Sequence, residues 1–498
     1  MVMVMIRFID CRRGLRLSDY EGDLYLSPLV SALRRTAAQF LKMDGHRLFV
    51  VNSTEHGGGV AEMLPSQIAL LQDLGLDARW VVIEPENADA FFNLTKRLHN
   101  ALHGQGSPGI SAEDKKLYDA VSRSAADALA PHLRPGDLLL VHDPQPAGMG
   151  AVLRREHAIH AIWRCHIGFD QRCDESDEAW SFLKPYVSTY DRTVFSLPEY
   201  APAFLNGCAA VIPPAIDPLS HKNRELSVHK LTGILANAQL IVPTEPTLYP
   251  NFSHPAKRFV QSGRFEAASD DGEFGLLFRP VVTQISRWDR LKGFAPLLEA
   301  FIKLKQSPLV SEHPELENPK RTRRRISLVR LVLAGPDPGS VADDPEGKRV
   351  LSELCERWLE LPSELQRDIA ILLLPMSSRK QNALMVNALQ RCSTIVVQNS
   401  LREGFGLTAT EAMAKSSFVL ASRAAGLRSQ IDDGVHGRLI NDANDPLEIA
   451  NALRKSLGDP LLRTHLGRNA RRRVGERYLI PSQLQVWIKL FAEVMKPS

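Results

Sequence analysis

The chain has 498 residues, 44% hydrophobic and 24% charged, which is ordinary for a globular protein and enough for two or three domains. A formal net charge of +4 is too small to indicate a nucleic-acid-binding or membrane-surface protein. The six cysteines contain no Cys-x-x-Cys pair, so they indicate neither a zinc cluster nor a disulfide scaffold, and we expect a reducing, cytoplasmic location.

The N-terminal segment, Met1 to Ile6, is apolar but short, and Arg7 and Asp10 follow it at once. A signal peptide begins with basic residues and continues with a longer apolar run. No stretch reaches the ~18 apolar residues of a membrane-spanning helix. We therefore expect a soluble protein.

From about residue 47, short apolar runs alternate with helical patterns. The strands predicted in this half are residues 48–52, 80–84, 138–142, 159–166, 193–196 and 209–212. Apolar residues from Val60 to Leu74 recur at helical spacing, and Pro65 would suit the first turn of that helix. Repeated strand and helix patterns predict a parallel sheet covered on both faces.

A glycine-rich turn follows the first predicted strand. Gly57, Gly58 and Gly59 let the backbone approach a ligand, because no Cβ stands in the way. Open α/β sheets bind ligands at the carboxyl ends of their strands. We therefore expect a ligand-binding loop here, whereas His56 is more simply explained as an ordinary loop residue.

Two further strand ends carry polar residues. His142 and Asp143 end one strand, where the carboxylate can orient an acceptor hydroxyl, and a helix-capping role for Asp143 is equally consistent. Arg164 and His166 end the next strand on one face, and burying both without partners would be costly, which favours a polar site. Cys165 would lie on the opposite face, and no activating pattern surrounds it.

Residues 235–278 interrupt the alternation. They are rich in Pro, Ser, Asp and Gly, which predicts a linker or insertion. Alternation then resumes with strands predicted at residues 281–286, 328–334, 369–374, 394–397, 418–421 and 437–440. The basic run Pro319 to Arg325 has no interleaved aromatics, so we expect a solvated surface loop rather than a polyanion site.

These patterns divide the chain into two doubly wound α/β halves. The predicted parts are an N-terminal domain over 1–250, a linker over 251–278, a C-terminal domain over 279–475 and a C-terminal helix over 476–498. The final helical pattern can cross back to the first half.

In the second half, the strand at 281–286 leads directly to Arg287 and Lys292. Arginine and lysine five positions apart at a strand-to-helix turn can bracket a diphosphate, the first as a fork and the second as a point charge. They would also neutralise charge that accumulates on a departing nucleotide. Taken alone, the pair is more simply explained by ordinary loop solubility.

The most informative segment, residues 398–414, places Glu403 and Glu411 eight positions apart around the turn Gly404-Phe405-Gly406. A glycine turn that leads into a helix offers unpaired backbone N–H groups to an anion. Carboxylates beside it can accept hydrogen bonds from sugar hydroxyls. Taken alone, two acids near a helix start are more simply explained as surface residues favoured by the helix dipole.

Together these segments resemble the glycosyltransferring trehalose synthases of glycosyltransferase family 4. The matching stretches are Asn52–Thr54 with Gly57–Glu62, His142–Pro146, Trp163–His166, Ile216–Ser220, Gln284–Asp289, Asp343–Gly347 and the segment around Glu403. They run in order over most of the chain.

The resemblance implies a GT-B fold, with two Rossmann-like domains that face each other across an interdomain cleft. It also implies that glucose is transferred from a nucleotide sugar, UDP-glucose or ADP-glucose, to free glucose, giving α,α-trehalose with retention. The acceptor attacks on the face that the diphosphate leaves, so no protein nucleophile is needed. We expect no cofactor and no metal, because the Asp pairs at 270–271, 343–344 and 432–433 lack histidines at ligand spacing.

The resemblance also implies roles for individual residues. Arg287 and Lys292 would hold the donor diphosphate, Glu403 the donor sugar hydroxyls and Glu411 the ribose. His166 would lie against the reacting carbon. The residues that would line the donor are Gly57, Gly58, Gly59, Gly404, Phe405, Gly406 and Leu407, and those on the acceptor side are His142, Asp143 and Arg164.

Three alternatives stay open. A trehalose phosphorylase would share these motifs, and a related retaining transferase would use another acceptor. The segments 235–278 and 311–325 are longer than the resemblance predicts, and the first of them could alter the choice of acceptor. A catalytically inactive GT-B scaffold would bind a sugar or a protein without reaction. The sequence also leaves open the donor base, the preferred direction of reaction and whether the chain forms a homodimer.

Overall fold

The computed structural model describes residues 3–11, 15–43, 47–55, 59–86, 88–242, 252–268, 274–307, 318–340 and 345–496. The chain divides into two compact units. Unit 1 comprises Met1–Ala215 and Arg477–Ser498, and unit 2 comprises Ile216–Glu476. The first continuous part of unit 1 therefore ends at Ala215, whereas the sequence pattern placed the end of the first domain at residue 250.

Unit 1 is built on a seven-stranded sheet. Its strands are β1 (Val4–Ile9), β2 (Arg47–Asn52), β3 (Asp77–Pro85), β4 (Leu138–His142), β5 (His160–Arg164), β6 (Arg192–Phe195) and β7 (Ala209–Val211), in the spatial order β1-β3-β2-β4-β5-β6-β7. All neighbours are parallel except β1, which runs antiparallel to β3. The six predicted strands are present, whereas the apolar N-terminal segment forms an edge strand that the pattern did not predict.

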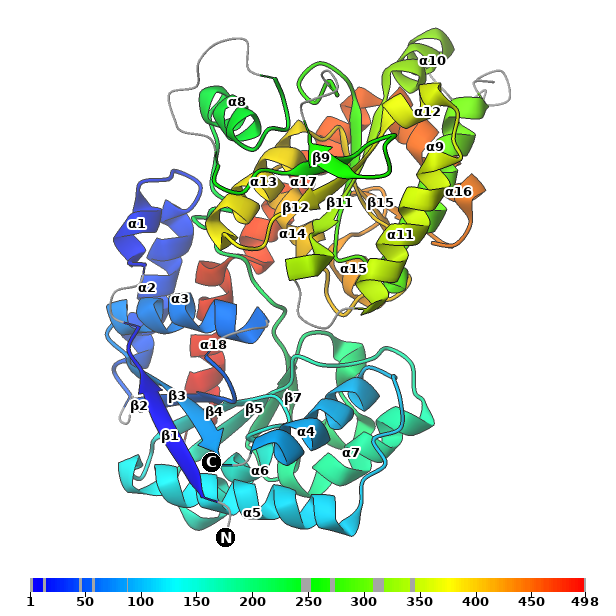
Figure 1. The fold of residues 1–498 in the computed structure, drawn as a ribbon. Coiled ribbons are helices and arrows are strands. Elements are labelled where there is room, and N and C mark those ends of the chain that lie inside the picture. The colour runs from blue at the N-terminus through cyan, green and yellow to red at the C-terminus, as the bar shows by residue number, and fades with distance from the viewer. Residues whose placement is uncertain are drawn as a thin grey trace. The chain divides into compact units, whose positions relative to one another are not determined.

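Helices cover this sheet (Figure 1). They are α1 (Leu17–Glu21), α2 (Ser27–Phe40), α3 (Gly59–Asp73), α4 (Ala88–Leu102), α5 (Ala112–Leu129), α6 (Ala147–Glu156), α7 (Asp174–Val187) and α18 (Ile480–Val494), with 3-10 turns at Ala130–His132, Pro198–Tyr200 and Ala203–Leu205. The last helix of the chain, α18, lies beside α2, where the Phe40 and Phe491 ring centroids are 6.4 Å apart. Pro65 lies inside α3, so the prediction that it opens the helix is wrong.

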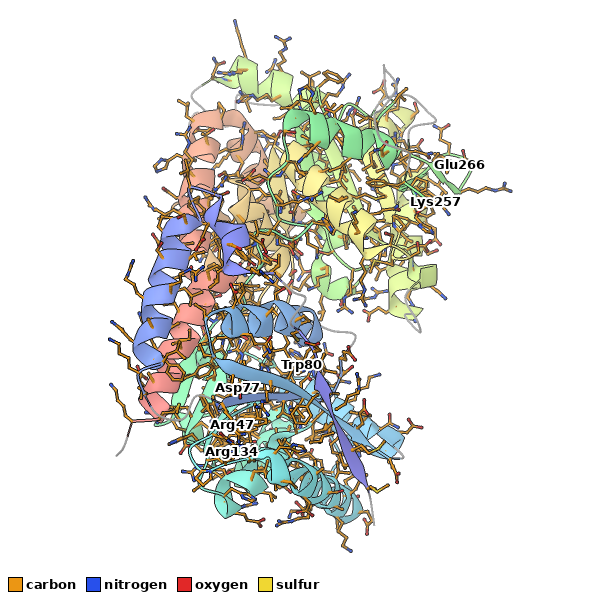
Figure 2. The ribbon with its side chains drawn as sticks, turned by 90° about the vertical axis from the view of Figure 1, so that its left-hand side faces the viewer. Arg47, Asp77, Trp80, Arg134, Lys257 and Glu266 are labelled. Atoms are coloured by element: carbon orange, nitrogen blue, oxygen red, sulfur yellow. The ribbon has the colours of Figure 1, made fainter. Side chains whose placement is uncertain are left out.

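In unit 1, charged and polar side chains gather at both ends of the central strands. Strand β4 is apolar from Leu138 to Val141 and wholly buried, as expected for a parallel strand covered on both faces. At the amino ends of β2 and β3, Arg47, Asp77 and Arg134 gather (Figure 2), and Arg47 pairs with Asp137. The carboxyl ends carry the residues with predicted chemistry.

Unit 2 is built on an eight-stranded sheet. Its strands are β8 (Lys257–Phe259), β9 (Phe265–Ala267), β10 (Val281–Ile285), β11 (Arg330–Pro336), β12 (Ile369–Leu374), β13 (Ile395–Gln398), β14 (Val419–Ser422) and β15 (Arg438–Ile440), in the order β15-β14-β13-β10-β11-β12-β8-β9. The six strands predicted for this half are all present, and they pair in parallel.

The helices of unit 2 alternate with these strands along the chain. They are α8 (Val228–Asn237), α9 (Phe294–Gln306), α10 (Pro319–Leu328), α11 (Pro345–Leu359), α12 (Ser363–Asp368), α13 (Arg379–Cys392), α14 (Leu407–Ala414), α15 (Ala425–Gln430), α16 (Pro446–Gly458) and α17 (Pro460–Arg477). Two 3-10 turns, Arg290–Lys292 and Pro338–Ser340, complete the described elements.

Two segments of unit 2 differ from prediction. The segment 235–278, expected to be a linker or insertion, begins in the last turn of α8 and contains the hairpin β8–β9, which carries Lys257 and Glu266 (Figure 2) and pairs antiparallel with β12. Its strands are only three residues long, so the alternation that marks a strand was too short to detect. The basic run forms the helix α10 instead of a loop, because Asn318 accepts the Arg321 N–H (3.0 Å) as its cap.

Both sheets reverse their strand order at one point. In unit 1 the reversal falls between β2 and β4, and in unit 2 it falls between β10 and β13. Ligands of open α/β sheets bind beyond the carboxyl ends of the strands at such a point. The predicted site residues lie at or just after the ends of these four strands or of their neighbour β5, so each unit presents a candidate site of its own.

Candidate active site

In unit 2, Lys292 and Glu403 form an ion pair. Lys292 Nζ lies 2.7 Å from Glu403 Oε2, and their side chains are only 16% and 13% exposed. The pair forms because β10 and β13 are adjacent and parallel, so the turns that follow them meet. The same carboxylate oxygen accepts hydrogen bonds from Ser400 Oγ (2.8 Å) and Gln398 Nε2 (3.3 Å).

Two buried amides fix the turns that carry this pair. Gln284 donates from Nε2 to the Lys292 carbonyl (2.7 Å) and accepts the Asn399 N–H at Oε1 (3.0 Å). Asn399 donates from Nδ2 to the Gly293 carbonyl (3.1 Å). Gly293 has a φ of +63°, and a Cβ there would lie 2.0 Å from the Asn399 carbonyl oxygen, so only glycine fits.

Arg287 follows the same strand but does not join the pair. Its side chain is 72% exposed, and Nη2 lies 3.8 Å from Asp289 Oδ2. The structure therefore brings Lys292 and Glu403 together and leaves Arg287 at the surface of the same turn. A long exposed side chain of this kind can reorient at little cost when an anion binds.

The turn Gly404-Phe405-Gly406 leads into α14, whose first residue is Leu407. Gly406 has a left-handed backbone (φ +87°), and Gln430 Nε2 donates to the Phe405 carbonyl, which holds the turn against α15. The first backbone N–H groups of a helix have no partner within the helix, so the start of α14 suits an anion.

Glu411 lies one turn later in α14 and is 7% exposed. Its Oε1 lies 3.5 Å from Lys222 Nζ, and Lys415 Nζ donates to the Glu411 carbonyl (3.0 Å) and to Asn223 Oδ1 (3.3 Å). Burial lowers the pKa of Lys415 to about 7, against the opposing effect of the Glu411 charge. Neither lysine was predicted from the sequence, although the four-residue spacing of Glu411 and Lys415 was a usable signal.

In unit 1, His142 and His166 form a stacked pair at the ends of the neighbouring strands β4 and β5. His142 Nδ1 lies 2.9 Å from His166 Nε2, and the rings are 5.2 Å apart at an interplanar angle of 12°. Burial lowers the pKa of His142 to about 3 and that of His166 well below its ordinary value, and the Arg164 charge lowers both further. Both imidazoles are therefore neutral near pH 7, with one donating and the other accepting.

Asp143 holds this pair in place. It has a left-handed backbone (φ +66°), and its Oδ1 accepts the backbone N–H of His166 (2.8 Å). Burial raises the pKa of Asp143 to about 6. Helix α6 has Pro146 at its N-cap and no side-chain cap, so the helix-capping role considered for Asp143 is wrong.

Arg164 is 1% exposed and lies within the core of unit 1. It donates from Nη2 to Ser196 Oγ (3.2 Å) and lies 6.0 Å from the Trp487 ring centroid, while Nε and Nη1 meet no partner among the described residues. Its charge lowers the pKa of both imidazoles. Cys165 is fully buried with a raised pKa, as expected for an inert thiol.

Some predicted residues are described only in part. Gly57 and Gly58, with His56, lie outside the described residues, and Gly59 is the first residue of α3. Of the aspartate pairs, 270–271 and 343–344 also lie outside, and Asp432 pairs with Arg473 (2.7 Å). Within the described part of the chain, no group of three or more His, Cys, Asp or Glu could hold a metal, and no helix is long and apolar enough to cross a membrane.

Comparison with known proteins gives a separate match for each of the two halves of the chain. The model of the trehalose synthase N-terminal domain matches residues 50–202, and that of group 1 glycosyl transferases matches residues 278–473. The trehalose synthase of Thermococcus litoralis is 33% identical over 486 residues, covering 96% of this chain and 97% of its own. A trehalose phosphorylase of Pleurotus sajor-caju is 25% identical over 407 residues, covering 78% of this chain and 50% of its own.

Solved structures confirm the predicted GT-B fold. An α,α-trehalose-phosphate synthase (UDP-forming) of Burkholderia xenovorans, in complex with glucose-6-phosphate, superposes with a TM-score of 0.59 at 16% identity. The alignment covers 91% of this chain and all of that one (100%). At this identity the match establishes the shared fold alone.

Proposed function

Because the chain belongs to the trehalose synthase family and is a glycosyltransferase, we propose that it is a retaining glucosyltransferase of family 4. It moves glucose from UDP-glucose or ADP-glucose to free glucose and forms α,α-trehalose. The observation that carries this proposal is the Lys292–Glu403 pair at the strand reversal of unit 2. A cation and a hydroxyl acceptor side by side suit a ligand that joins a diphosphate to a sugar.

For the donor, Lys292 and Arg287 hold the diphosphate with the backbone at the start of α14. Phosphate oxygens compete with Glu403 for the Lys292 ammonium, and the carboxylate that is released accepts hydrogen bonds from the sugar hydroxyls. Glu411 binds the ribose, and Lys222 and Lys415 position it. This assignment is supported by the low exposure of the pair, since charges act more strongly in a site with little water.

For the acceptor side of unit 1, we assign His142, Asp143 and Arg164, and we place His166 beside the reacting carbon of the donor sugar. Neutral imidazoles can donate to and accept from sugar hydroxyls, and His142 Nε2 is buried without a partner among the described residues. Burial keeps both rings neutral, and the Arg164 charge adds to this effect. Asp143, ionised above about pH 6, sets the position of His166 through its backbone.

In the reaction, the bond between the sugar C1 and the phosphate oxygen breaks. The acceptor hydroxyl oxygen bonds to C1 on the same face, and its proton passes to the leaving phosphate oxygen. Positioning and charge stabilisation carry this step, so we propose that neither a metal nor another cofactor takes part. All six cysteines are free, and we assign the enzyme to the cytoplasm.

Product analysis tests the proposal. The protein is incubated with UDP-glucose or ADP-glucose and free glucose, and the products are identified by chromatography and NMR. We expect α,α-trehalose and the nucleoside diphosphate in equal amounts. A different disaccharide would identify another acceptor, and no product with any acceptor in a panel would indicate a binding scaffold.

A phosphorylase is the second candidate, because the similarity to the Pleurotus sajor-caju phosphorylase extends over most of this chain. It would consume trehalose in the presence of inorganic phosphate and would not depend on a nucleotide. The same preparation, assayed with trehalose and phosphate, separates the two activities.

A further inference from the structure

Unit 1 contains a cavity of about 380 Å³ that the proposed transfer does not use. It lies among the loop that follows β5, the helix α7 and the segment 199–204 that follows β6. Because β5 and β6 are parallel neighbours, it opens at the carboxyl edge of the sheet, where such folds bind ligands. His142, Asp143 and His166 do not line it.

One wall of the cavity is aromatic and rigid. Trp180 is half-buried, and its ring meets Trp163 and Phe195 edge-on, with centroids 6.2 Å away in each case. Phe204 lies 6.2 Å from Trp180 and is 36% exposed. Rings held in this way present an apolar face at little entropic cost, which suits the C–H face of a sugar ring.

The rim of the cavity is polar and carries both signs of charge. Three carboxylates, Asp170, Asp177 and Glu199, line it with two cations, Arg172 and Lys184. The formal balance of three negative and two positive charges is −1, which disfavours a phosphorylated ligand. Alternating acceptors and donors beside an aromatic wall match the hydroxyls of a neutral carbohydrate.

We propose that this cavity is a second carbohydrate site, which binds a neutral sugar of one or two rings. Ligand pockets range from about 300 to 1,000 Å³, so a volume of about 380 Å³ suits a small sugar. The site goes beyond the proposed transfer and stands whether or not that activity is found.

The cavity also shares a loop with His166. Phe169 and Asp170, which line the cavity, follow His166 in the same loop. Gly168 lies between His166 and Phe169, and its carbonyl is hydrogen-bonded to His103 Nδ1 (3.1 Å). A sugar in the cavity would contact the loop that carries His166. Occupancy is therefore expected to alter the rate of transfer.

The test is a calorimetric titration of the full chain with glucose and with trehalose, in the absence of nucleotide. The double variant Asp177→Asn/Glu199→Gln removes two charged acceptors from exposed positions. We expect one binding event to weaken at least about tenfold, because hydrogen bonds to charged groups are lost. The matched control, Asp174→Asn, removes an exposed carboxylate of the same helix that does not line the cavity and should bind as the wild type does.

Three results would overturn the proposal: no saturable binding by wild-type protein, undiminished binding by the double variant, or tighter binding of glucose 6-phosphate than of glucose at this site. A background of Glu403→Gln separates this site from the donor site, since sugar binding in the cavity should persist there. Transfer by the double variant, assayed separately, reports on the proposed function independently of the cavity.

Discussion

The two units share a plan and differ in their chemistry. Each has a parallel sheet whose strand order reverses once, and each places its polar groups just beyond that reversal. Unit 2 presents an ion pair, Lys292 with Glu403, whereas unit 1 presents two neutral imidazoles and a carboxyl with a raised pKa. We propose that the same fold position binds charged phosphates in unit 2 and uncharged hydroxyls in unit 1.

The two sites are also fixed differently. In unit 2 the side-chain amides of Gln284 and Asn399 link the two turns that carry the ion pair. Hydrogen bonds therefore fix the positions of two charged side chains that are little exposed. In unit 1 a hydrogen bond from the His166 backbone to Asp143 positions the imidazole pair, and burial sets its charge. Variants that separate these two mechanisms test the comparison.

The largest effect is expected from Lys292→Ala and Glu403→Ala. The first variant loses a cation that stabilises the leaving diphosphate, and the second loses the carboxylate that orients the donor sugar. Each should lower kcat/KM at least ~10²- to 10³-fold, while the thermal transition stays close to wild type. The matched control is Arg290→Ala, in the same turn, whose exposed partner Glu353 lies 2.6 Å away. Steady-state kinetics should show less than about a twofold change for the control, and full activity in either site variant would contradict the assignment.

Gly293→Ala should come next. A left-handed residue other than glycine costs about 1–2 kcal/mol, and the new Cβ would also overlap the Asn399 carbonyl. We expect a lower unfolding free energy and a fall in kcat of about 10²-fold, since the Lys292 turn would shift. Gly233→Ala, which has nothing within 4 Å of its added Cβ, is the control. Equal denaturation midpoints for both variants would show that the turn is not constrained as described.

The pH dependence of unit 1 depends on Asp143, whose pKa is raised to about 6. If its charge is needed, kcat/KM should fall below pH 6 and be about tenfold lower near pH 5. Asp143→Asn should remove this acid limb and keep the backbone, because Asn tolerates a positive φ better than Ala does. An unchanged acid limb in Asp143→Asn would assign it to another group.

The same raised pKa has a consequence for stability. The folded protein keeps the Asp143 proton up to about pH 6, whereas the unfolded chain releases it near pH 4. The protonated form therefore contributes stability that is fully present below about pH 4 and is lost as the pH rises through 6. Denaturation of wild type and Asp143→Asn at several pH values between these limits measures the difference.

The smallest effect is expected from Lys415→Met, because this lysine contacts the backbone of Glu411 and not its carboxylate. The KM for the nucleotide sugar should rise several-fold with little change in kcat, as expected for a positioning residue. Lys303→Met, at an exposed position of α9, is the control. A fall in kcat alone would place Lys415 in the chemistry.

Strands could be predicted from the sequence where a run of apolar residues was long enough to be recognised. All twelve predicted strands are present, and the clearest of them are buried parallel strands that read as continuous apolar runs, such as Ile369–Leu374. The three-residue strands β8 and β9 were missed because they are too short to show a period. The edge strand β1 was missed because its burial follows no regular alternation.

Residues of the candidate site could be picked out from the sequence, but the contacts between them could not. Glu403 and Lys292 stood out beside glycine turns, yet only the adjacency of β10 and β13 makes them a pair. Lys222 is distant in sequence from Glu411, so no local pattern could reveal their contact. Arg287 was expected beside Lys292, but the turn leaves it exposed.

The most direct test of the assignment of the donor to unit 2 is calorimetric titration of UDP-glucose and ADP-glucose into wild-type, Lys292→Ala and Arg290→Ala proteins. We predict saturable binding of at least one donor to the wild type and to Arg290→Ala, and affinity at least about tenfold weaker for Lys292→Ala. Equal affinity in all three proteins would contradict the account, because the donor diphosphate would then be held elsewhere.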